Sequence, residues 1–368
     1  MTLHIERLSD PSALDALTAE WEKLNQQLIP RTPFTSPIWA KLWWKHLRQT
    51  RASRRHEFFV HIVRDSTGRL VAIIPLVITH QPAFGPLRLR TLQFFGASDG
   101  SITEHRRVIC RPEDEAEIIQ TFIRYLHDLK ANWDLFLWTG MRINGQPRNT
   151  SKVYRKIPEY VVSLPTSWAS FRAGLSRNMR EKIRKCYKLL SRNGHTFVFC
   201  AVDRSAEIPA ALDRFLALHA ARARFKHAFK HRDYFAEPSR RDFIADCAVQ
   251  MAKRNQLVIF ELEIGGRVVA SRMAFVFGSE MYLYYSGFDP AWGKHSVMTT
   301  LMCETFKWAI EHGVLLVNLS RGKDLSKLRW SPREHVFHDS ALASPTLRGQ
   351  FAFQAFEILV GQFSSRHL

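Results

Sequence analysis

Apolar residues recur at helical spacing near the start of the chain and at strand-like spacing after it. Residues 10–28 carry Leu and Trp every three or four positions, which predicts a helix that ends at Pro30. A second helix is expected to begin at Ser36-Pro37, and residues 113–130 form another amphipathic helix. Between and after these helices, strand composition is found at residues 58–63, 70–78, 87–95 and 133–138.

The second half of the chain repeats this order. Residues 212–225 and 243–253 are expected to be helical, and residues 296–312 form a helix that ends at Gly313. Strands are predicted at residues 257–264, 268–277, 281–285 and 314–319, with Gly265-Gly266 as a hairpin turn.

Two halves with the same order of elements predict two like α+β domains, each a mixed, mostly antiparallel sheet flanked by helices. Coincidence is the alternative, because hairpins and helices are common. We place the domains at residues 1–150 and 151–345, followed by a helical tail at 346–368. Residues 97–104 and 142–157 are the expected loops or linkers.

Residues 176–193 give the sharpest amphipathic pattern, with Ser176 as the expected N-cap and Gly194 as the stop. Arg177 and Arg180 then lie at the positive end of the helix dipole, which is unfavourable. That placement favours a use for the cations in binding a phosphate, carboxylate or sugar acid. A solvated basic face explains the pattern equally well.

The formal net charge of +19 predicts an anionic partner, which could be a phosphorylated cofactor, nucleic acid, an anionic lipid surface or an acidic polymer. The five Cys are scattered without a CxxC pair, so a disulfide framework or zinc site is not expected. The N-terminus lacks the pattern of a signal peptide, and the longest apolar run, residues 70–78, is too short to span a bilayer. We therefore expect a cytoplasmic protein, with a peripheral role at the inner membrane left open.

Residues 288–296 lead from a predicted strand into the helix that begins at Val297. Asp289-Pro290 ends the strand, Gly293 permits a turn, and Ser296 is a candidate N-cap. Lys294 and His295 bring positive charge to the helix N-terminus, where backbone N–H groups favour an anion such as a pyrophosphate.

These features resemble the bacterial CelD/BcsL-type acetyltransferases, also called the BioF2-like acetyltransferase domain, within the GNAT superfamily. The resemblance covers nearly the whole chain and is strongest over residues 164–330. The motifs that carry it are Arg177-Asn178-Met179-Arg180, Leu218-His219 with Arg222, Gly287-Phe288-Asp289-Pro290, Glu311-His312-Gly313, Arg321-Gly322 with Lys327 and Arg329-Trp330, Phe34 to Trp39, and Ile74-Pro75-Leu76.

The resemblance implies two tandem GNAT-like (acyl-CoA N-acyltransferase) domains and acetyl-CoA as the acyl donor, with no metal. It also implies an acceptor related to the cell envelope or to polysaccharide biosynthesis. The Fem-type transferases are similar in architecture. Two departures stand out: the family's Ser-Pro-Gly is Ser296-Val297-Met298 here, and the Tyr expected after Asp324 is replaced by Leu325. They predict that the donor is held differently or that activity is reduced.

Acyl transfer needs an aligned thioester, a route for the acceptor proton and donors to the tetrahedral oxyanion. Backbone N–H groups around residues 284–287 are candidate oxyanion donors. Candidate bases are His219, Asp289, Asp324 and His295. A satisfied half-buried histidine is the plainer reading of His219, and Asp289 fits a turn cap as well as a base.

Two further groups of residues are assigned by position. The candidate cofactor-binding residues are Tyr285, Gly287, Gly293, Lys294, His295 and Ser296. The candidate substrate-binding residues are Arg180, Arg184, Arg222, Arg321, Lys327 and Arg329. His227 and His231 have a metal-compatible spacing, but no Glu lies between them and cations surround them, so we expect no metal.

The sequence therefore predicts an acyl-CoA-dependent transferase acting on an amine or hydroxyl. Two alternatives stay open: a Fem-like transferase that uses aminoacyl-tRNA, and a non-catalytic basic adaptor of the same fold on nucleic acid or an anionic membrane. In the first domain the helix-opening segment Cys110-Arg111-Pro112-Glu113 is acidic where a phosphate site should be basic. We therefore expect the first domain to shape the acceptor cleft.

Overall fold

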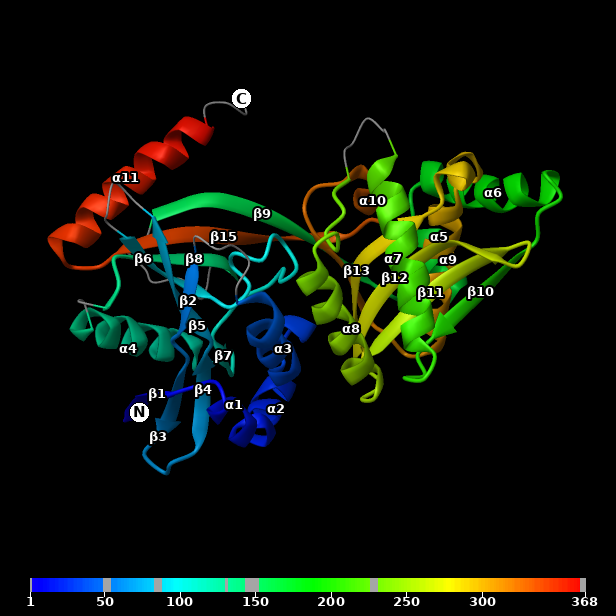
Figure 1. The fold of residues 1–368 in the computed structure, drawn as a ribbon. Coiled ribbons are helices and arrows are strands. Elements are labelled where there is room, and N and C mark those ends of the chain that lie inside the picture. Colours follow the sequence, from blue (N-terminus) through cyan, green and yellow to red (C-terminus); the bar gives the residue numbers. More distant parts are fainter. Residues whose placement is uncertain are drawn as a thin grey trace. The chain divides into compact units, whose positions relative to one another are not determined.

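The computed structural model describes residues 2–48, 54–82, 88–129, 132–142, 152–225 and 231–364. Its contacts divide the chain into two units, one of Met1–Ile157 with Val336–Leu368 and one of Pro158–His335. The segment 346–368, which we expected to be a separate tail, is grouped with the first unit. Both units combine helices with mostly antiparallel strands, so the predicted α+β class is confirmed (Figure 1).

The first unit contains two groups of hydrogen-bonded strands. A four-stranded antiparallel sheet has the order β1-β3-β4-β7, and a second run has the order β9-β15-β8-β6-β5-β2. Its strands are β1 (Leu3–Arg7), β2 (Arg55–Phe58), β3 (His61–Asp65), β4 (Leu70–Ile74), β5 (Leu76–Pro82), β6 (Arg88–Phe94), β7 (Ile109–Cys110), β8 (Leu135–Arg142), β9 (Lys152–Ser163) and β15 (Arg333–Ala343). Its helices are α1 (Ala13–Ala16), α2 (Thr18–Gln26), η1 (Pro33–Thr35), α3 (Pro37–Leu47), α4 (Glu115–Asp128) and α11 (Leu347–Ser364).

Two strands predicted as single pieces are each divided between the two groups of strands. The predicted strand at residues 70–78 becomes β4 and β5, which separate at Pro75. Proline has no N–H to donate to a ladder, so the pairing changes there. The predicted strand at 58–63 likewise splits into β2 and β3, and Phe59 N donates to Leu76 O at the crossing.

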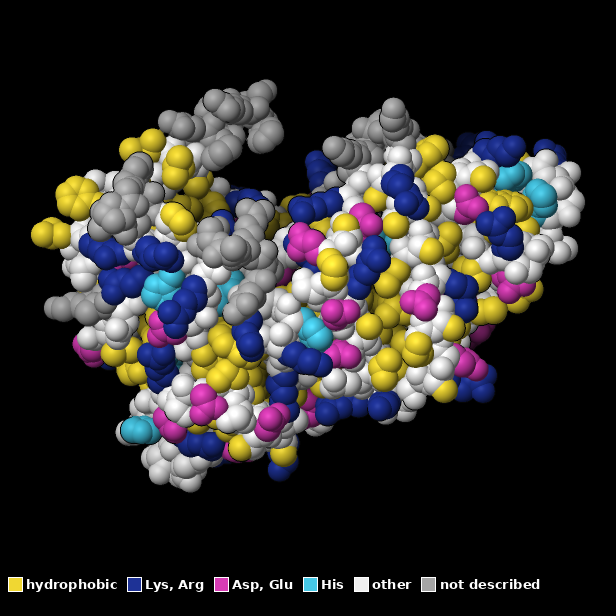
Figure 2. All heavy atoms as spheres, viewed as in Figure 1, with side chains coloured by type: hydrophobic (Ala, Val, Ile, Leu, Met, Phe, Trp, Pro, Cys, Tyr) yellow, Lys and Arg dark blue, Asp and Glu magenta, His cyan; other side chains and the backbone are white. Residues whose placement is uncertain are grey.

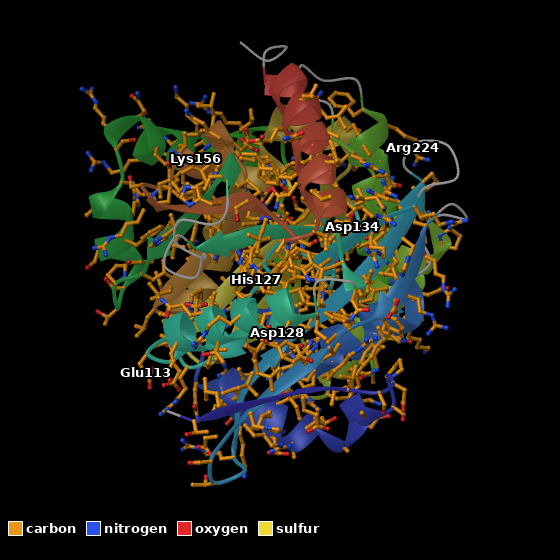
Figure 3. The ribbon with its side chains drawn as sticks, turned by 90° about the vertical axis from the view of Figure 1, so that its left-hand side faces the viewer. Glu113, His127, Asp128, Asp134, Lys156 and Arg224 are labelled. Atoms are coloured by element: carbon orange, nitrogen blue, oxygen red, sulfur yellow. The ribbon has the colours of Figure 1, made fainter. Side chains whose placement is uncertain are left out.

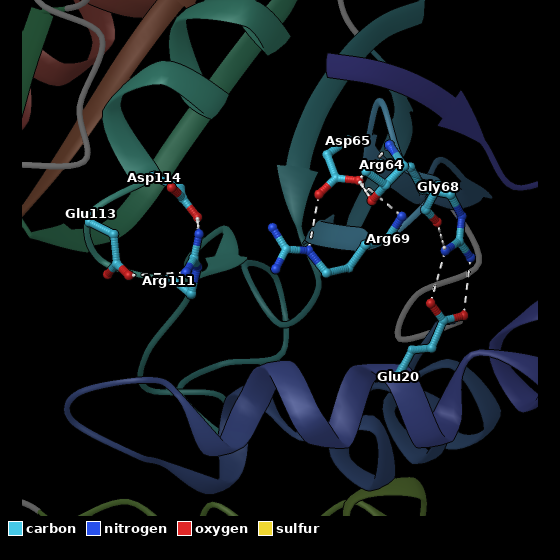
Figure 4. A network of polar contacts seen from close by, with 9 residues as sticks. Glu20, Arg64, Asp65, Gly68, Arg69, Arg111, Glu113 and Asp114 are labelled. Carbon is cyan, nitrogen blue, oxygen red and sulfur yellow. Dashed lines mark hydrogen bonds and ion pairs between the residues drawn. The ribbon is translucent and has the colours of Figure 1, made fainter. Parts of the chain in front are cut away.

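Ion pairs tie the helices of this unit to its strands. Arg64 of β3 donates to both carboxylate oxygens of Glu20 of α2 at 2.8 and 3.1 Å (Figure 4). The fully buried Asp134, labelled in Figure 3, accepts from Arg90 of β6 and pairs with Arg348 of α11. Truncating either arginine would leave a buried carboxylate with fewer partners, which is costly.

The second unit is a six-stranded sheet with helices on both faces. Its strand order is β10-β11-β12-β13-β14-β9, antiparallel except between β13 and β14. The strands are β10 (Phe197–Val202), β11 (Leu257–Ile264), β12 (Arg267–Phe277), β13 (Glu280–Phe288), β14 (Leu316–Arg321) and the end of β9. The helices are α5 (Trp168–Gly174), α6 (Arg177–Arg192), α7 (Ile208–Arg224), α8 (Pro238–Ala252), η4 (Pro290–His295), α9 (Val297–Glu311) and α10 (Leu325–Leu328).

The helices of this unit form two layers. α5, α6 and α9 pack together on one face of the sheet, and α7 and α8 cover the other (Figure 1). Met281 and Leu283 of β13 belong to the core on the α9 side, which includes Met179 and Ile183 of α6. Ser176 caps α6 by accepting from Met179 N, as predicted. The Gly265-Gly266 turn has two positive φ angles, 58° and 76°, which a tight hairpin requires.

Three long strands were not predicted: β9, β10 and β15. β9 begins inside residues 142–157, which we expected to be a loop or linker; residues 143–151 of that segment lie outside the described part of the chain. Within the residues that the structure covers, no helix has both the length and the apolar composition needed to cross a bilayer.

Candidate active site

The second unit contains a fork between two parallel strands. β13 pairs with β14 over Glu280–Tyr282, and among the described residues this ladder stops there while β13 continues to Phe288. β14 stays paired with β9 at this point, with an irregular register between Asn318 and Arg321. Asn318 is held by two side-chain hydrogen bonds. Its side chain donates to the buried Glu159 at 2.7 Å and accepts from Ser320 N at 2.8 Å. Beyond Tyr282 the two strands diverge, and β13 continues to Phe288 without β14 at its side among the described residues.

A bulge lies on β13 just beyond this fork. Arg272 of β12 pairs with Ser286 and Ala274 pairs with Leu283, so Tyr284 and Tyr285 together oppose one residue of β12. A bulge interrupts the ladder and redirects backbone groups. The backbone segment 284–287, which the sequence offered as oxyanion donors, therefore lies beyond the point where the two strands diverge.

The connection from β13 to α9 is a short 3-10 helix followed by a left-handed residue. Asp289 starts it, since its carboxylate accepts from Ala291 N at 3.0 Å. Ser296 has φ of +56° and caps α9 through its backbone carbonyl, which accepts from Thr299 N at 2.8 Å, rather than through its side chain. The first N–H groups of α9, at Val297 and Met298, have no partner inside the helix, and Lys294 is exposed beside them. This helix start favours an anion.

The other two side chains of this loop are directed into the protein. His295 is buried, with its ring 5.1 Å from that of His195 and 5.2 Å from that of Trp292. Burial, followed by the charges of His195 and Lys294, lowers the pKa of His295, so it is neutral at pH 7. Met298 packs against the core on the α9 side. Of the two predicted cations, Lys294 and His295, only Lys294 is thus available to bind an acyl donor.

Gly287 is required by packing. A Cβ atom on residue 287 would lie 2.3 Å from His219 N and 2.4 Å from Leu218 C, because α7 crosses β13 at this point. At Gly293 the nearest atom to an added Cβ is Cε2 of Phe288 at an ordinary 3.5 Å. Tyr285 lies on the α7 side, with its ring 5.5 Å from His219 and 4.8 Å from Tyr234.

His219 is satisfied at both ring nitrogens. Nδ1 lies 3.0 Å from the carbonyl oxygen of Ser286, and Nε2 lies 3.3 Å from Tyr234 N. A carbonyl accepts and a backbone N–H donates, so the proton is on Nδ1 and the Nε2 lone pair is occupied. Burial lowers the pKa of His219 against the raising effect of the hydrogen bond to Ser286. This geometry supports the plainer reading, a positioning residue rather than a base.

Two arginines from different elements converge beside the bulge. Arg222 of α7 donates to Ser286 Oγ at 2.8 Å and to His231 Nε2 at 2.9 Å. Arg272 of β12 makes a longer bond of 3.4 Å to the same Ser286 hydroxyl. Burial lowers the pKa of Arg222, and burial followed by the charge of Arg222 lowers that of Arg272 to about 10. The side chains of Arg272 and Ser286 were not among the site groups predicted from the sequence.

The carboxylate of Asp324 interacts electrostatically with the cluster of Arg222 and Arg272. It accepts from Ser326 N at 2.7 Å and caps α10. Burial raises its pKa, but the hydrogen bonds from Ser326 and the charges of Lys327 and Arg222 outweigh burial, so the pKa is lowered. Its charge in turn raises the pKa of Arg222, Arg272 and Arg329 against the lowering effect of burial. Asp324, Arg222 and Arg329, all predicted site residues, are therefore electrostatic neighbours.

Three other predicted substrate ligands, Arg180, Arg184 and Lys327, have structural partners, and Arg321 differs from them. Arg180 donates to the carbonyl oxygens of Ala173 and Leu175 at the end of α5, and Arg184 forms an exposed pair with Glu181. Lys327 Nζ lies within 3.3 Å of three carbonyl oxygens, those of Ser320, Arg321 and Gly322. Two buried atoms of Arg321, Nε and Nη1, have no hydrogen-bond partner among the described residues.

An open cavity lies at the C-terminal end of α7. Its volume is about 570 Å³, and it is lined by Ala220, Ala223, Arg224, His231, Arg232 and Asp233. His231 links it to Arg222. His227, the other half of the histidine pair seen in the sequence, lies outside the described residues. Over the described ranges, no group of three or more His, Cys, Asp and Glu side chains is placed to hold a metal ion.

At the corresponding helix start of the first unit, the cation is paired with carboxylates. Arg111, before α4, is paired with Asp114 at 2.8 Å and lies 3.5 Å from Glu113 (Figure 4). An anion at this position would have to compete with two carboxylates. The local charge is thus acidic, as the sequence indicated.

Comparison with known proteins agrees with the site. Residues 177–328 match the family model described as an acetyltransferase (GNAT) domain. No curated protein matches the chain significantly. The matched segment contains the fork, the bulge, the start of α9 and the arginine cluster. The match covers less than half of the chain and confirms the prediction of an acyltransferase.

Three solved structures share the fold across most of the chain. FemX has a TM-score of 0.56 at 9% identity, covering 92% of this chain and 97% of that one. The C-terminal domain of a protein named as a lysylphosphatidylglycerol synthetase candidate from Agrobacterium fabrum has a TM-score of 0.50 at 11% identity, covering 93% and 96%. A conserved protein of unknown function from Bacteroides thetaiotaomicron has a TM-score of 0.50 at 10% identity, covering 93% and 100%. At such identities the likeness is one of fold.

Proposed function

We propose that the protein transfers an acetyl group from acetyl-CoA to an amine or hydroxyl of an acceptor related to the cell envelope or to polysaccharide synthesis. GNAT domains take their acyl group from acyl-CoA. The observation that carries the proposal is the fork between β13 and β14, which opens beside the start of α9. The nature of the acceptor and the assignment to the CelD/BcsL-type acetyltransferases rest on the motifs of the sequence.

Each part of the donor has a matching feature in the second unit. The diphosphate would bind the first N–H groups of α9 with Lys294 beside them. The extended pantetheine arm would lie along the edge of β13 beyond Tyr282, as an added strand does at a sheet edge. The thioester carbonyl would then reach the bulge at Tyr284 and Tyr285, whose backbone N–H groups would stabilise the developing oxyanion.

Asp324 is the base we propose among the predicted candidates. It lies within electrostatic reach of Arg222 and its lowered pKa keeps it ionised at neutral pH. His219 has both ring nitrogens occupied. Asp289 caps a turn, as Asp324 does, but it lies 3.9 Å from the exposed Arg267 rather than near Arg222. A carboxylate at this position would accept the acceptor's proton directly or through a water molecule.

Calorimetry with acetyl-CoA tests the donor site. We expect the wild-type protein to bind acetyl-CoA and Lys294→Glu to weaken it at least tenfold, because the substitution replaces an attractive charge with a repulsive one at the helix start. Lys253→Glu is the matched control. Lys253 is exposed at the end of α8, just before β11, and β11 begins at the end of the sheet opposite to Phe288. No binding of acetyl-CoA at millimolar concentration would end the proposal.

A Fem-like transfer from aminoacyl-tRNA is the second candidate, favoured by the net charge of +19. Figure 2 shows Lys and Arg side chains spread over the visible surface of each unit with Asp and Glu between them. Such a surface binds tRNA weakly and with a steep dependence on salt. We therefore expect acyl transfer from acetyl-CoA and none from aminoacyl-tRNA. The opposite result would favour the second candidate.

A further inference from the structure

We infer that the acceptor carries a carboxylate or phosphate group, which Arg222 and Arg272 bind beside the bulge of β13. This inference rests on the proposed function and assigns the chemical class of its second substrate.

The two guanidinium groups are positioned as a pair with spare donors. Both are directed at Ser286 Oγ, from α7 at 2.8 Å and from β12 at 3.4 Å. Ser286 directly follows the bulge, so the pair lies next to the backbone that we propose to hold the thioester carbonyl. The Nε atoms of both arginines are buried and have no hydrogen-bond partner among the described residues. Buried N–H donors are rarely left unpaired without a functional reason.

The charge balance around Ser286 also calls for an anion. Arg222, Arg272 and Arg329 all interact with the carboxylate of Asp324, while Asp233 faces His219 at 4.0 Å, so these three arginines share one carboxylate among the described residues. Arg222 and Arg272 further repel each other. Cations removed from water are retained only when paired or hydrogen-bonded, and a planar guanidinium pair matches the oxygens of a carboxylate or phosphate.

The donor's diphosphate is the alternative anion for this pair, and the affinity of Arg272→Gln for acetyl-CoA separates the two. Arg272 pairs with Phe260 of β11, whose ring lies 5.1 Å from that of Trp308 of α9, so Arg272 is on the α9 face of the sheet. Arg222 comes from α7 on the other face, and its Nη2 donates to His231, which lines the open cavity at the end of α7. That cavity, of about 570 Å³, is large enough to receive a small acceptor.

The position of the pair limits the size of the acceptor. Ser286 is one residue beyond Tyr285, so the anionic group and the attacking amine or hydroxyl should be only a few bonds apart. An amino acid presents a carboxylate in this way, and an amino sugar phosphate presents a phosphate. Both sources share the chemistry of a compact anion next to a nucleophile.

Two arms of one experiment test the inference. Calorimetry of the full chain with inorganic phosphate and with acetate should show binding of at least one anion, and Arg272→Gln should weaken it at least tenfold. Release of CoA from acetyl-CoA is then measured with two matched pairs of amines: glycine with glycinamide, and glucosamine 6-phosphate with glucosamine. We expect kcat/KM for one anionic member to exceed that of its neutral partner at least tenfold. The pair that shows the preference identifies carboxylate or phosphate.

Arg272→Gln should remove that preference by raising KM for the anionic amine, while the Kd for acetyl-CoA stays unchanged. Arg272→Lys should restore part of the preference, and the exposed Lys253→Gln should change neither quantity. Thermal unfolding of each variant separates loss of fold from loss of binding. Wild-type protein that binds neither anion, equal use of charged and neutral amines, or a parallel loss of acetyl-CoA affinity in Arg272→Gln would each overturn the inference. Failure to bind acetyl-CoA at all would instead count against the proposed function.

Discussion

Gly287 and His219 are in such close backbone contact that any side chain on residue 287 would overlap α7. A Cβ atom there would lie 2.3 Å from His219 N. The crossing fixes the register of α7 on β13: the His219 ring binds the carbonyl oxygen of Ser286, and Arg222, one turn later, reaches the hydroxyl of the same serine. One contact between a helix and a strand thus positions the arginine of the proposed acceptor site.

Gly287→Ala should therefore destabilise the second unit strongly. The added Cβ would have to displace the α7 backbone rather than a flexible side chain, and overpacking of this kind costs about 2–3 kcal/mol or more. Urea unfolding followed by fluorescence measures the loss. Gly293→Ala is the matched control, because its Cβ would meet only ordinary contact at 3.5 Å and should change stability by less than about 0.5 kcal/mol. Equal stability of the two variants would contradict the packing role of Gly287.

The role of Gly287 shows where sequence reasoning reached its limit. The pattern of apolar residues was sufficient to predict the hairpin of β11 and β12, the helices α6 and α9 and the repeated order of elements. It identified Gly287 as part of a Gly-Phe-Asp-Pro turn and as a candidate cofactor-binding residue. Residue 287 must lack a side chain because the backbone of α7 packs against it, and the contacting residue, His219, lies 68 positions earlier in the sequence. Spacing along the chain carries no signal for such a contact.

Arg272 was missed for a related reason. It lies inside a strand whose other residues are mostly apolar, and the strand was recognised by that composition. An isolated arginine in a buried strand is itself a usable signal, because burying a cation is costly unless it has a partner or a ligand. The predicted basic residues of α6, by contrast, are arranged by helical periodicity alone, and Arg184 proves to be paired on the surface. Strands β9 and β15 were missed because their partners lie far away in the sequence.

The ion pair between Arg214 and Glu261 gives a second prediction. Two hydrogen bonds of 2.9 and 2.8 Å join the arginine of α7 to the carboxylate of β11, whose side chain is only 4% exposed. Arg214→Ala should cost about 3 kcal/mol, because it leaves a buried carboxylate without its partner. Chemical unfolding measures the change.

The double variant Arg214→Met with Glu261→Met separates the net value of this pair from the cost of breaking it. Replacing both charges with apolar side chains of similar length should bring stability back to within about 1 kcal/mol of wild type. A double variant as unstable as Arg214→Ala would show that the pair itself, rather than the unpaired carboxylate, accounts for the loss.

His61 predicts a pH dependence for the first unit. It is fully buried, its Nδ1 lies 3.1 Å from the carbonyl oxygen of Phe59, and its Nε2 has no partner among the described residues. Burial, against the raising effect of the bond to Phe59, lowers its pKa from 6.5 to about 3, and burial lowers that of His56 to about 4. A histidine with a depressed pKa in the folded state binds its proton preferentially when unfolded. Stability should therefore be complete above pH 6.5 and fall as the pH drops towards these folded values.

Each such histidine contributes a slope of about 1.4 kcal/mol per pH unit in that window. His61→Phe, which keeps an aromatic ring among Phe59, Phe122 and Tyr125, should remove one such slope between pH 6 and pH 4. The measurement is the free energy of unfolding in urea at both pH values. The exposed His4 of β1 supplies a control, since His4→Gln should leave the slope as it is. A wild-type slope retained in His61→Phe would rule out His61 as its source.

Lys327 could bind the substrate or stabilise the turn at residues 320–322, and a substitution separates these two roles. Its ammonium group lies 3.2, 2.6 and 3.3 Å from the carbonyl oxygens of Ser320, Arg321 and Gly322, in a turn where Ser320 and Gly322 have φ of 67° and 92°. Lys327→Met keeps the stem but removes all three donors, so stability should fall by about 1–3 kcal/mol. Lys323→Met, at an exposed position in the same segment, should be nearly neutral. Because Arg222 and Arg272 bond to Ser286 rather than to this turn among the described residues, binding of inorganic phosphate by calorimetry should weaken far less in Lys327→Met than in Arg272→Gln. Unchanged stability together with a large loss of acceptor affinity would instead make Lys327 the substrate ligand that its sequence position suggests.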